Sequence, residues 1–225
     1  MKLLNVLILF LLNVLIVAET QANSFYITYP KLIREGELVS ESDYKKSKIK
    51  PYYPNSEIYY YKDSDSYYEL KALPNGIIMM RDPKTGIANF GLADLGDFPE
   101  QSWQSLCTKD EITDAVTCMI NNESLTIMYN NGRQMISSVK DVNNLDFNKK
   151  QYVRIDGNTA ISANGIIENP KFGEIVRQMS NGKTIKTRYF DNHGVEHNTN
   201  SNLSGFRYAY EYLIKSKDEL KNSHK

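Results

Sequence analysis

The sequence has little cysteine and tryptophan, and it has no excess of charge of either sign. Its 225 residues include two cysteines and one tryptophan, and 27 basic residues balance 27 acidic ones. Two cysteines exclude a disulfide-dense miniature scaffold and a four-cysteine zinc site. A net charge of zero argues against a nucleic-acid partner, because proteins that wrap nucleic acid carry a basic excess or stripe.

The sequence also lacks an apolar run long enough to span a membrane. The apolar stretch over residues 3–18 is shorter than the roughly 20 residues that cross a bilayer. Small residues at Thr20 and Ala22 follow it, which is typical of a signal peptide cleaved after Ala22. We therefore predict a signal peptide over residues 1–22, a periplasmic or secreted mature chain, and no membrane span after cleavage. The alternative is an uncleaved membrane anchor.

Export would place the two cysteines in an oxidising compartment. Cys107 and Cys118 lie eleven positions apart, so the pair does not have the two-residue spacing of a redox-active C-x-x-C motif. A structural disulfide is the expected state in such a compartment. Closing a loop of this length stabilises the fold by about 2–3 kcal/mol in the chain-entropy model.

Short β-prone runs, each ended by Asp, Pro, Asn or Gly, indicate antiparallel sheets. Residues 23–95 are predicted to be a tyrosine-rich extension with a β-meander, and residues 96–225 a β-sandwich domain. Within that domain, Asn130-Asn131-Gly132 predicts a tight hairpin turn, because an Asn-Gly pair tolerates the positive φ angles that such turns need. Asp156-Gly157-Asn158 predicts a second hairpin, between strands at 152–155 and 159–161.

Helical periodicity occurs at two places in this domain. Asn169 is a candidate cap and Pro170 suits the first helical position. Four apolar residues then share one helix face: Phe172, Ile175, Val176 and Met179. Asn181-Gly182 is expected to end this helix in a left-handed conformation. A second helix is predicted from Ser204 to about Ile214, with a frayed charged tail.

These elements predict a mainly β, α+β fold. The expected architecture is an antiparallel β-sandwich with one internal and one C-terminal helix, preceded by the tyrosine-rich meander. No internal repeat, glycine-rich phosphate loop or serine nucleophile motif is found in the sequence. We therefore predict no catalytic residue and no cofactor.

The segment His193-Gly194-Val195-Glu196-His197 matches the H-x-x-E-H pattern of one class of zinc peptidases. That chemistry needs both histidines on one face of a helix. Here Gly194 disfavours a helix, and the flanking residues have turn composition. We interpret the segment as a solvated loop between the last strand and the last helix, and we predict no metal site.

Tyrosine is concentrated near the N-terminus, where ten of the 16 tyrosines lie between residues 26 and 68. Tyr59, Tyr61 and Tyr67 are candidate binding residues, because exposed tyrosine rings beside lysines contact proteins or sugars with little loss of side-chain entropy. The alternative is that alternate tyrosines pack onto the domain below.

Several features between residues 103 and 213 occur in an order that resembles the invasion-associated locus B family of exported bacterial proteins. They are Trp103, Cys107, Cys118, the strand at 152–156, the helical segment 175–179 with Gly182, the strand at 184–190, and Leu203-Ser204-Gly205-Phe206 with Ala209. The resemblance implies a β-sandwich with added helices, export and no known catalytic residue. This chain differs from many members of that family because it lacks a second cysteine pair. Its tyrosine-rich extension has no counterpart in the family.

Taken together, the sequence predicts an exported bacterial envelope or secreted protein that acts as a non-enzymatic binding module. Its partner would be a protein or glycan in the envelope or on a host surface. The alternative is a periplasmic hydrolase with an unrecognised site. A hydrolase should show a pocket where histidines or carboxylates converge with perturbed pKa values, and a binding module should show an exposed contact surface.

Overall fold

The computed structural model describes residues 37–46, 58–63, 65–92, 102–138 and 142–223. The predicted signal peptide and the first part of the predicted extension lie outside the described residues. Within those ranges, no helix has the length and apolar character needed to cross a bilayer.

In the described part of the chain, nine strands form one antiparallel sheet, and each strand pairs with the next along the sequence. The strands are Glu37–Val39 (β1), Tyr59–Asp63 (β2), Ser66–Ala72 (β3), Ile77–Arg81 (β4), Ala88–Leu92 (β5), Trp103–Lys109 (β6), Val116–Asn121 (β7), Thr126–Asn130 (β8) and Arg133–Ser137 (β9). Phe90 of β5 is paired with Trp103 of β6. The predicted boundary near residue 96 lies outside the described residues, and strands from both sides of it belong to this one sheet.

A second antiparallel sheet has four strands in the order β11-β10-β12-β13. They are Lys150–Ile155 (β10), Ile161–Asn164 (β11), Thr184–Phe190 (β12) and Glu196–Asn202 (β13). The helices are Glu41–Lys46 (α2), Lys171–Asn181 (α3) and Phe206–Asn222 (α4), with short 3₁₀ turns at Pro74–Gly76 and Val142–Asn144. The predicted mainly β fold, with two antiparallel sheets, an internal helix and a C-terminal helix, is confirmed.

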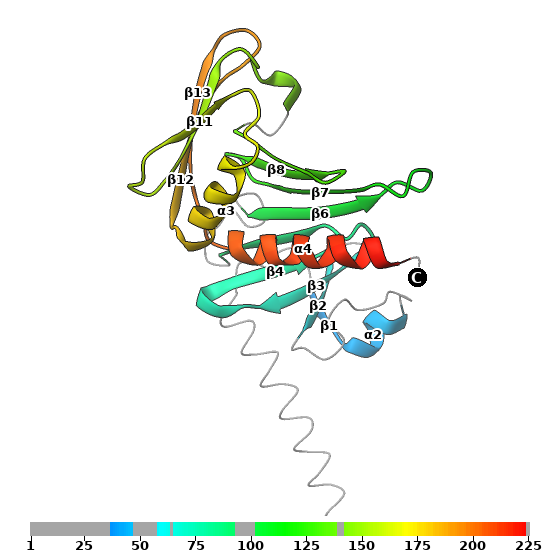
Figure 1. Cartoon of the computed structure of the whole chain (residues 1–225). Coiled ribbons are helices and arrows are strands. Elements are labelled where there is room, and N and C mark those ends of the chain that lie inside the picture. Colours follow the sequence, from blue (N-terminus) through cyan, green and yellow to red (C-terminus); the bar gives the residue numbers. More distant parts are fainter. Residues whose placement is uncertain (1–36, 47–57, 64, 93–101, 139–141, 224–225) are drawn as a thin grey trace, which may run out of the picture.

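The larger sheet curves around α4. Figure 1 shows β6, β7 and β8 on one side of this helix and β4 on the other. Side chains make the same connection, because Arg81 Nε of β4 donates to the Tyr212 hydroxyl at 3.2 Å, and the hydroxyls of Tyr129 (β8) and Tyr210 lie 2.6 Å apart. The four-stranded sheet and α3 lie near the N-terminal end of α4, away from the C-terminus (Figure 1).

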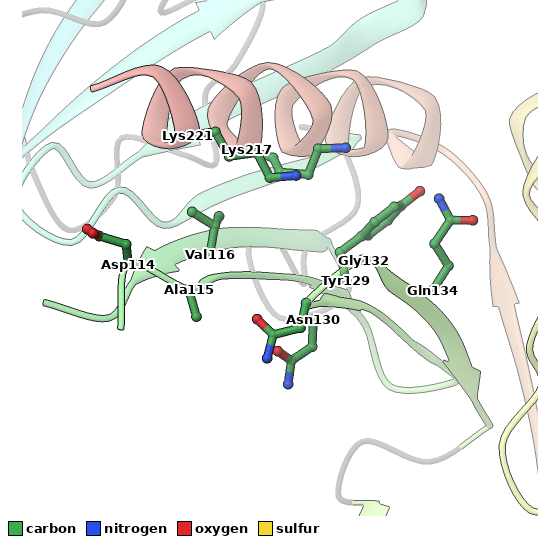
Figure 2. Close-up of a pocket in the computed structure, with 10 residues that line it drawn as sticks. Asp114, Ala115, Val116, Tyr129, Asn130, Gly132, Gln134, Lys217 and Lys221 are labelled. Carbon is green, nitrogen blue, oxygen red and sulfur yellow. The ribbon is translucent and has the colours of Figure 1, made fainter. Parts of the chain in front are cut away.

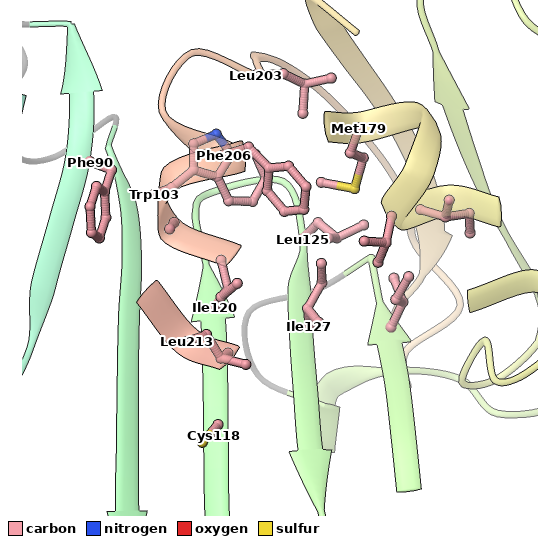
Figure 3. Close-up of a cluster of buried hydrophobic side chains, with 14 of the residues drawn as sticks. Phe90, Trp103, Cys118, Ile120, Leu125, Ile127, Met179, Leu203, Phe206 and Leu213 are labelled. Atoms are coloured by element: carbon pink, nitrogen blue, oxygen red, sulfur yellow. The ribbon is translucent and has the colours of Figure 1, made fainter. Parts of the chain in front are cut away.

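One hydrophobic core joins both sheets and both long helices. Trp103 is fully buried, and its ring packs edge-on against Phe206 of α4 with the ring centroids 5.0 Å apart. Figure 3 shows Ile120 and Ile127 on the sheet facing this cluster, with Met179 entering from α3. Burying such side chains contributes about 1.5–3 kcal/mol each, so this cluster accounts for much of the stability.

The predicted disulfide is present between β6 and β7. Cys107 and Cys118 are bonded and occupy directly opposite positions of the two strands. Cys118 is fully buried. The bond therefore joins two neighbouring strands that lie under α4.

The entry to α4 depends on Gly205, whose φ is +88°. A Cβ at this position would lie 2.4 Å from the carbonyl oxygen of Phe90. Glycine is needed here because the backbone is left-handed and because it touches β5. This contact attaches the last helix to a strand of the predicted extension.

The predictions for α3 are right about its buried face and wrong about its ends. Phe172, Ile175, Val176 and Met179 are all buried. Asn169 provides no cap, since Pro170 occupies the N-cap position and no side chain caps the helix there. Gly182 has a φ of −89°, so its role is not a left-handed turn.

Gly182 is instead required by close packing. A Cβ there would lie 2.5 Å from Cγ2 of Ile155. The neighbouring Asp156 carboxylate accepts hydrogen bonds from the backbone N–H groups of Thr184 at 2.8 Å and Lys183 at 3.1 Å. These bonds, the Thr184 bond foremost, lower the pKa of Asp156 below its ordinary value of 3.8.

The two predicted hairpins have different outcomes. The β8–β9 turn is as predicted, with positive φ at Asn131 (47°) and Gly132 (83°). The β10–β11 hairpin forms, but Val153 pairs with Ile161 at its end, so β11 begins at Ile161 and not at 159. In its loop, the Asp156 carboxylate accepts a hydrogen bond from the start of β12.

The last helix is longer than predicted, and it extends to Asn222 instead of fraying after Ile214. On its surface, Lys215 lies 3.8 Å from Glu219 in an i,i+4 pair. Lys109 of β6 donates to the carbonyl of Leu220 at 3.5 Å. Packing of the helix against the large sheet therefore extends it through a segment whose composition is charged.

A buried ion pair connects the strands of the predicted extension with α4. The Glu69 side chain is fully buried, and its Oε2 lies 2.9 Å from Nη1 of Arg81. The Tyr44 hydroxyl donates to Glu69 Oε1 at 3.1 Å. Arg81 also donates to Tyr212, whose hydroxyl donates to the Gly86 carbonyl. Burial is the main reason that the pKa of Tyr44 is raised.

Candidate functional site

The H-x-x-E-H segment lies on a β-hairpin, which corrects the prediction of a loop before the last helix. His193 and Gly194 are in the turn, and Glu196 begins β13. All seven residues of β13 pair with β12. The inner side of this strand is held by hydroxyl groups and not by apolar burial: Thr199 Oγ1 lies 2.5 Å from Thr187 Oγ1, and Ser201 bonds Ser124.

His197 takes part in local contacts within this hairpin. Its Nε2 lies 2.8 Å from Oδ2 of Asp191, and its ring stacks on Tyr189 with the centroids 4.9 Å apart. The His197 contact is the largest cause of the lowered pKa of Asp191. No group of three metal-ligating side chains occurs among the residues that the structure describes.

The three candidate tyrosines of the extension are placed differently from one another. Tyr61 is 6% exposed and packs against Tyr68, whereas Tyr59 and Tyr67 are half-buried. Tyr67 also lies edge-on to Tyr44 of α2, with the centroids 6.1 Å apart. Tyr67 is paired with Lys62, so strand alternation places it on the opposite face of the sheet from Tyr59 and Tyr61. The role of these three tyrosines in binding stays a prediction.

A broader polar surface lies on the outer face of the four-stranded sheet. A groove of about 540 Å³ is lined there by side chains of β10, β12 and β13. We call the following six residues the basic face: Tyr152, Arg154, Lys186, Arg188, Asn198 and Asn200. Three of them are cations, in a chain whose net charge is zero.

Strand alternation builds this face. In β12, Ile185 and Thr187 are buried while Lys186 and Arg188 are exposed, because successive side chains of a strand point to opposite sides. Strand β10 follows the same pattern, with Val153 buried and Arg154 exposed. Ile185 and Val153 belong to the hydrophobic core, so packing fixes the strands that carry these cations.

The register brings the residues of the basic face into two rows across three strands. Arg154 is paired with Lys186, and Lys186 with Asn200. Within the described ranges, these three exposed side chains have no hydrogen-bond or ion-pair partner. Like charges directly opposite on neighbouring strands are destabilising. An anion placed between Arg154 and Lys186 would remove that repulsion.

The second row is already oriented by contacts within the protein. Tyr152 is paired with Arg188, and Arg188 with Asn198. Arg188 Nε donates to Oδ1 of Asn198 at 3.0 Å and lies 3.4 Å from Oε1 of Glu196. The guanidinium is thus oriented by Asn198 and Glu196 on the same face as Tyr152, where it can bind a carboxylate or phosphate with little further ordering.

Figure 2 shows another groove, of about 420 Å³, between α4 and strands β7–β9. Lys217 lies over the Tyr129 ring, with Nζ 5.0 Å from the ring centroid, and Tyr129 bonds Tyr210. Burial, followed by the Tyr210 contact, raises the pKa of Tyr129. Lys217 and the Tyr129 ring are therefore engaged in packing α4 onto the sheet, unlike the cations of the first row of the basic face.

Sequence reasoning missed the basic face, although part of its signal was visible. The strands at 152–155 and 184–190 were predicted, and both alternate apolar residues with Lys or Arg. The pairing of β10 with β12 is what brings Arg154 beside Lys186, and α3 separates the two strands in the sequence. Nothing local in the sequence indicates that pairing.

Comparisons with known proteins do not extend this description. No family model, no curated protein and no solved structure matches the chain.

Proposed function

We propose that this chain is an exported bacterial binding protein, periplasmic or secreted, that engages an anionic partner through the basic face and catalyses no reaction there. The observation that carries the proposal is the first row, where Arg154 and Lys186 face each other in register without a counter-ion in the described part of the chain. Charge complementarity of this kind favours a carboxylate- or phosphate-bearing ligand.

The groove has the composition of a binding surface. Its lining provides cationic donors, asparagine amides and one tyrosine ring. Carboxylates and histidines, the usual general acids and bases, are not among the residues that line it. This composition supports binding over hydrolysis.

Export is supported by the apolar leader over residues 3–18 and by the disulfide between Cys107 and Cys118. The resemblance to the invasion-associated locus B family remains part of the proposal. It is supported by the packing of Trp103, at one end of the resemblance, against Phe206 at the other. Mass spectrometry of the exported protein should find Asn23 at its N-terminus; a product that retains Met1 would contradict this part.

Binding is tested with the double variant Arg154→Gln/Lys186→Gln. The mature protein is titrated with polygalacturonate, polyglutamate and single-stranded DNA at low and physiological salt. We expect at least one polyanion to bind, and the double variant to bind it about tenfold more weakly, because two exposed charge contacts are lost.

The matched control is Arg177→Gln/Lys84→Gln, which removes one exposed arginine and one exposed lysine elsewhere on the surface. It should bind like the wild type. If no polyanion binds, or if both double variants lose the same affinity, the basic face is not the binding site.

A further inference from the structure

A second hollow lies at the edge strand β13 and shares one residue with the groove of the basic face. This hollow, of about 290 Å³, is lined by Asn122, Glu123, Thr184, Asn200, Ser201 and Asn202. Asn200 lines both the second hollow and the groove of the basic face. The two hollows therefore share one residue of β13, and we call the three asparagines of this strand, Asn198, Asn200 and Asn202, the asparagine track.

Asparagines are regularly spaced along this track. Asn198, Asn200 and Asn202 occupy alternate positions of β13, so they share one face at a spacing of about 6.6–6.8 Å. Asparagine is depleted in strands, and β13 has it at three of seven positions without a single apolar residue. A local conflict between sequence and structure of this kind is expected where a strand serves a function.

The chemistry of the track points to a polymer that carries both hydroxyl and carboxylate groups. An amide side chain donates and accepts at once, as a sugar hydroxyl does. Beside the amides run the cations of β12, with Lys186 opposite Asn200 and Arg188 opposite Asn198. Guanidinium and ammonium groups bind carboxylates, and the Tyr152 ring presents a flat apolar surface to a sugar ring.

We propose that the ligand of the basic face is a linear acidic polysaccharide that lies along β13 and occupies both hollows, an inference that rests on the proposed function. The observation specific to this step is the row of amides that continues the cationic groove into the second hollow.

Other polyanions fit the track less well. Single-stranded nucleic acid binds on successive aromatic rings, whereas Tyr152 is the one aromatic side chain among the residues that line the two hollows. Two carboxylates lie close to the track: Glu196 contacts Arg188 at one end, and Glu123 lines the hollow at the other. Both would repel a continuous row of phosphates more than a chain in which charges alternate with hydroxyls.

The test uses calorimetric titration of the mature, disulfide-bonded protein with size-graded oligomers. Di-, tetra- and octasaccharides of galacturonan, alginate and hyaluronan are compared with polyglutamate and single-stranded DNA of equal charge. We expect at least one uronate polymer to bind best, with the octasaccharide at least about tenfold tighter than the disaccharide, because only a longer chain reaches both hollows.

Asn200→Ala is the variant that tests the track, because the Asn200 side chain has no partner within the described residues and its loss should leave the fold intact. This variant should bind the octasaccharide about fivefold to tenfold more weakly, which is the effect of losing one or two hydrogen bonds. The matched control Asn181→Ala, at the exposed end of α3, should leave the affinity unchanged.

The outcomes separate this inference from the proposed function. Tighter binding of polyglutamate or DNA than of every uronate oligomer, an octasaccharide no tighter than its disaccharide, or an unaffected Asn200→Ala variant would overturn the polysaccharide track while leaving the basic face in place. Failure of every polyanion to bind would overturn both.

Discussion

Replacing Gly205 with alanine should destabilise the protein more than the same replacement at any other glycine that the structure describes. The backbone at Gly205 has φ of +88° and ψ of −18°, a left-handed conformation that costs a residue with a Cβ about 1–2 kcal/mol. The new Cβ would lie 2.4 Å from the Phe90 carbonyl oxygen and 2.6 Å from its carbonyl carbon.

The clash cannot be relieved by a side-chain rotation, because the atoms it meets are backbone atoms of β5. That strand pairs with β4 on one side and β6 on the other. Overpacking of this kind costs typically about 1–3 kcal/mol, so the total for Gly205→Ala is about 2–5 kcal/mol. A domain is usually stable by only about 5–15 kcal/mol, so much of the stability would be lost.

Urea denaturation followed by tryptophan fluorescence measures this effect directly. The single tryptophan, Trp103, packs against Phe206, the residue next to Gly205. The control is Gly173→Ala in α3, where nothing lies within 4 Å of the added Cβ and alanine should stabilise the helix by up to about 1 kcal/mol. A Gly205→Ala variant within about 0.5 kcal/mol of the wild type would refute the close approach of α4 to β5.

Three further predictions concern stability. Glu69→Gln should cost about 3–5 kcal/mol by thermal or urea denaturation, since Arg81 would keep a buried charge without its partner; an unchanged midpoint would contradict the buried pair. Cys107→Ser/Cys118→Ser should lower stability by about 2–3 kcal/mol, and non-reducing peptide mapping should link the two cysteines in the wild type; two free thiols would refute the bond. For Asp156, NMR titration should find a pKa below 3.8. Its contribution to stability is complete above that ordinary value and is lost as pH falls through the lower native pKa, so Asp156→Asn should reduce the acid sensitivity of folding; a native pKa at or above 3.8 would contradict this.

Local chemistry explains why some elements could be predicted. The β8–β9 turn follows from Asn131 and Gly132, because positive φ is a property of those residue types. The buried face of α3 follows from helical spacing. The cysteine pair followed from the expected compartment, and the structure places the two residues opposite each other on neighbouring strands.

The errors arose where long-range contacts outweigh local preference. Gly182 was assigned to a left-handed turn, but its requirement comes from Ile155, which is distant in the sequence. The segment that forms β13 was interpreted as a loop because of its turn composition and Gly194, yet pairing with β12 and hydroxyl contacts hold it as a strand. The last turns of α4 have a charged composition, and their contact with β6 keeps them helical.

The sequence by itself determined the strand-rich composition, the tight turn at Asn131-Gly132, the apolar face of α3 and the alternation that turns Arg154 and Lys186 away from the core. These properties depend on residue type and on spacing along a few turns or strand positions. Only the tertiary structure decided that β10 pairs with β12, that the large sheet curves around α4, and that the two cations meet beside Asn200. Such pairings join segments far apart in the chain, and their energy comes from burying both inner faces in one core, which no local pattern encodes.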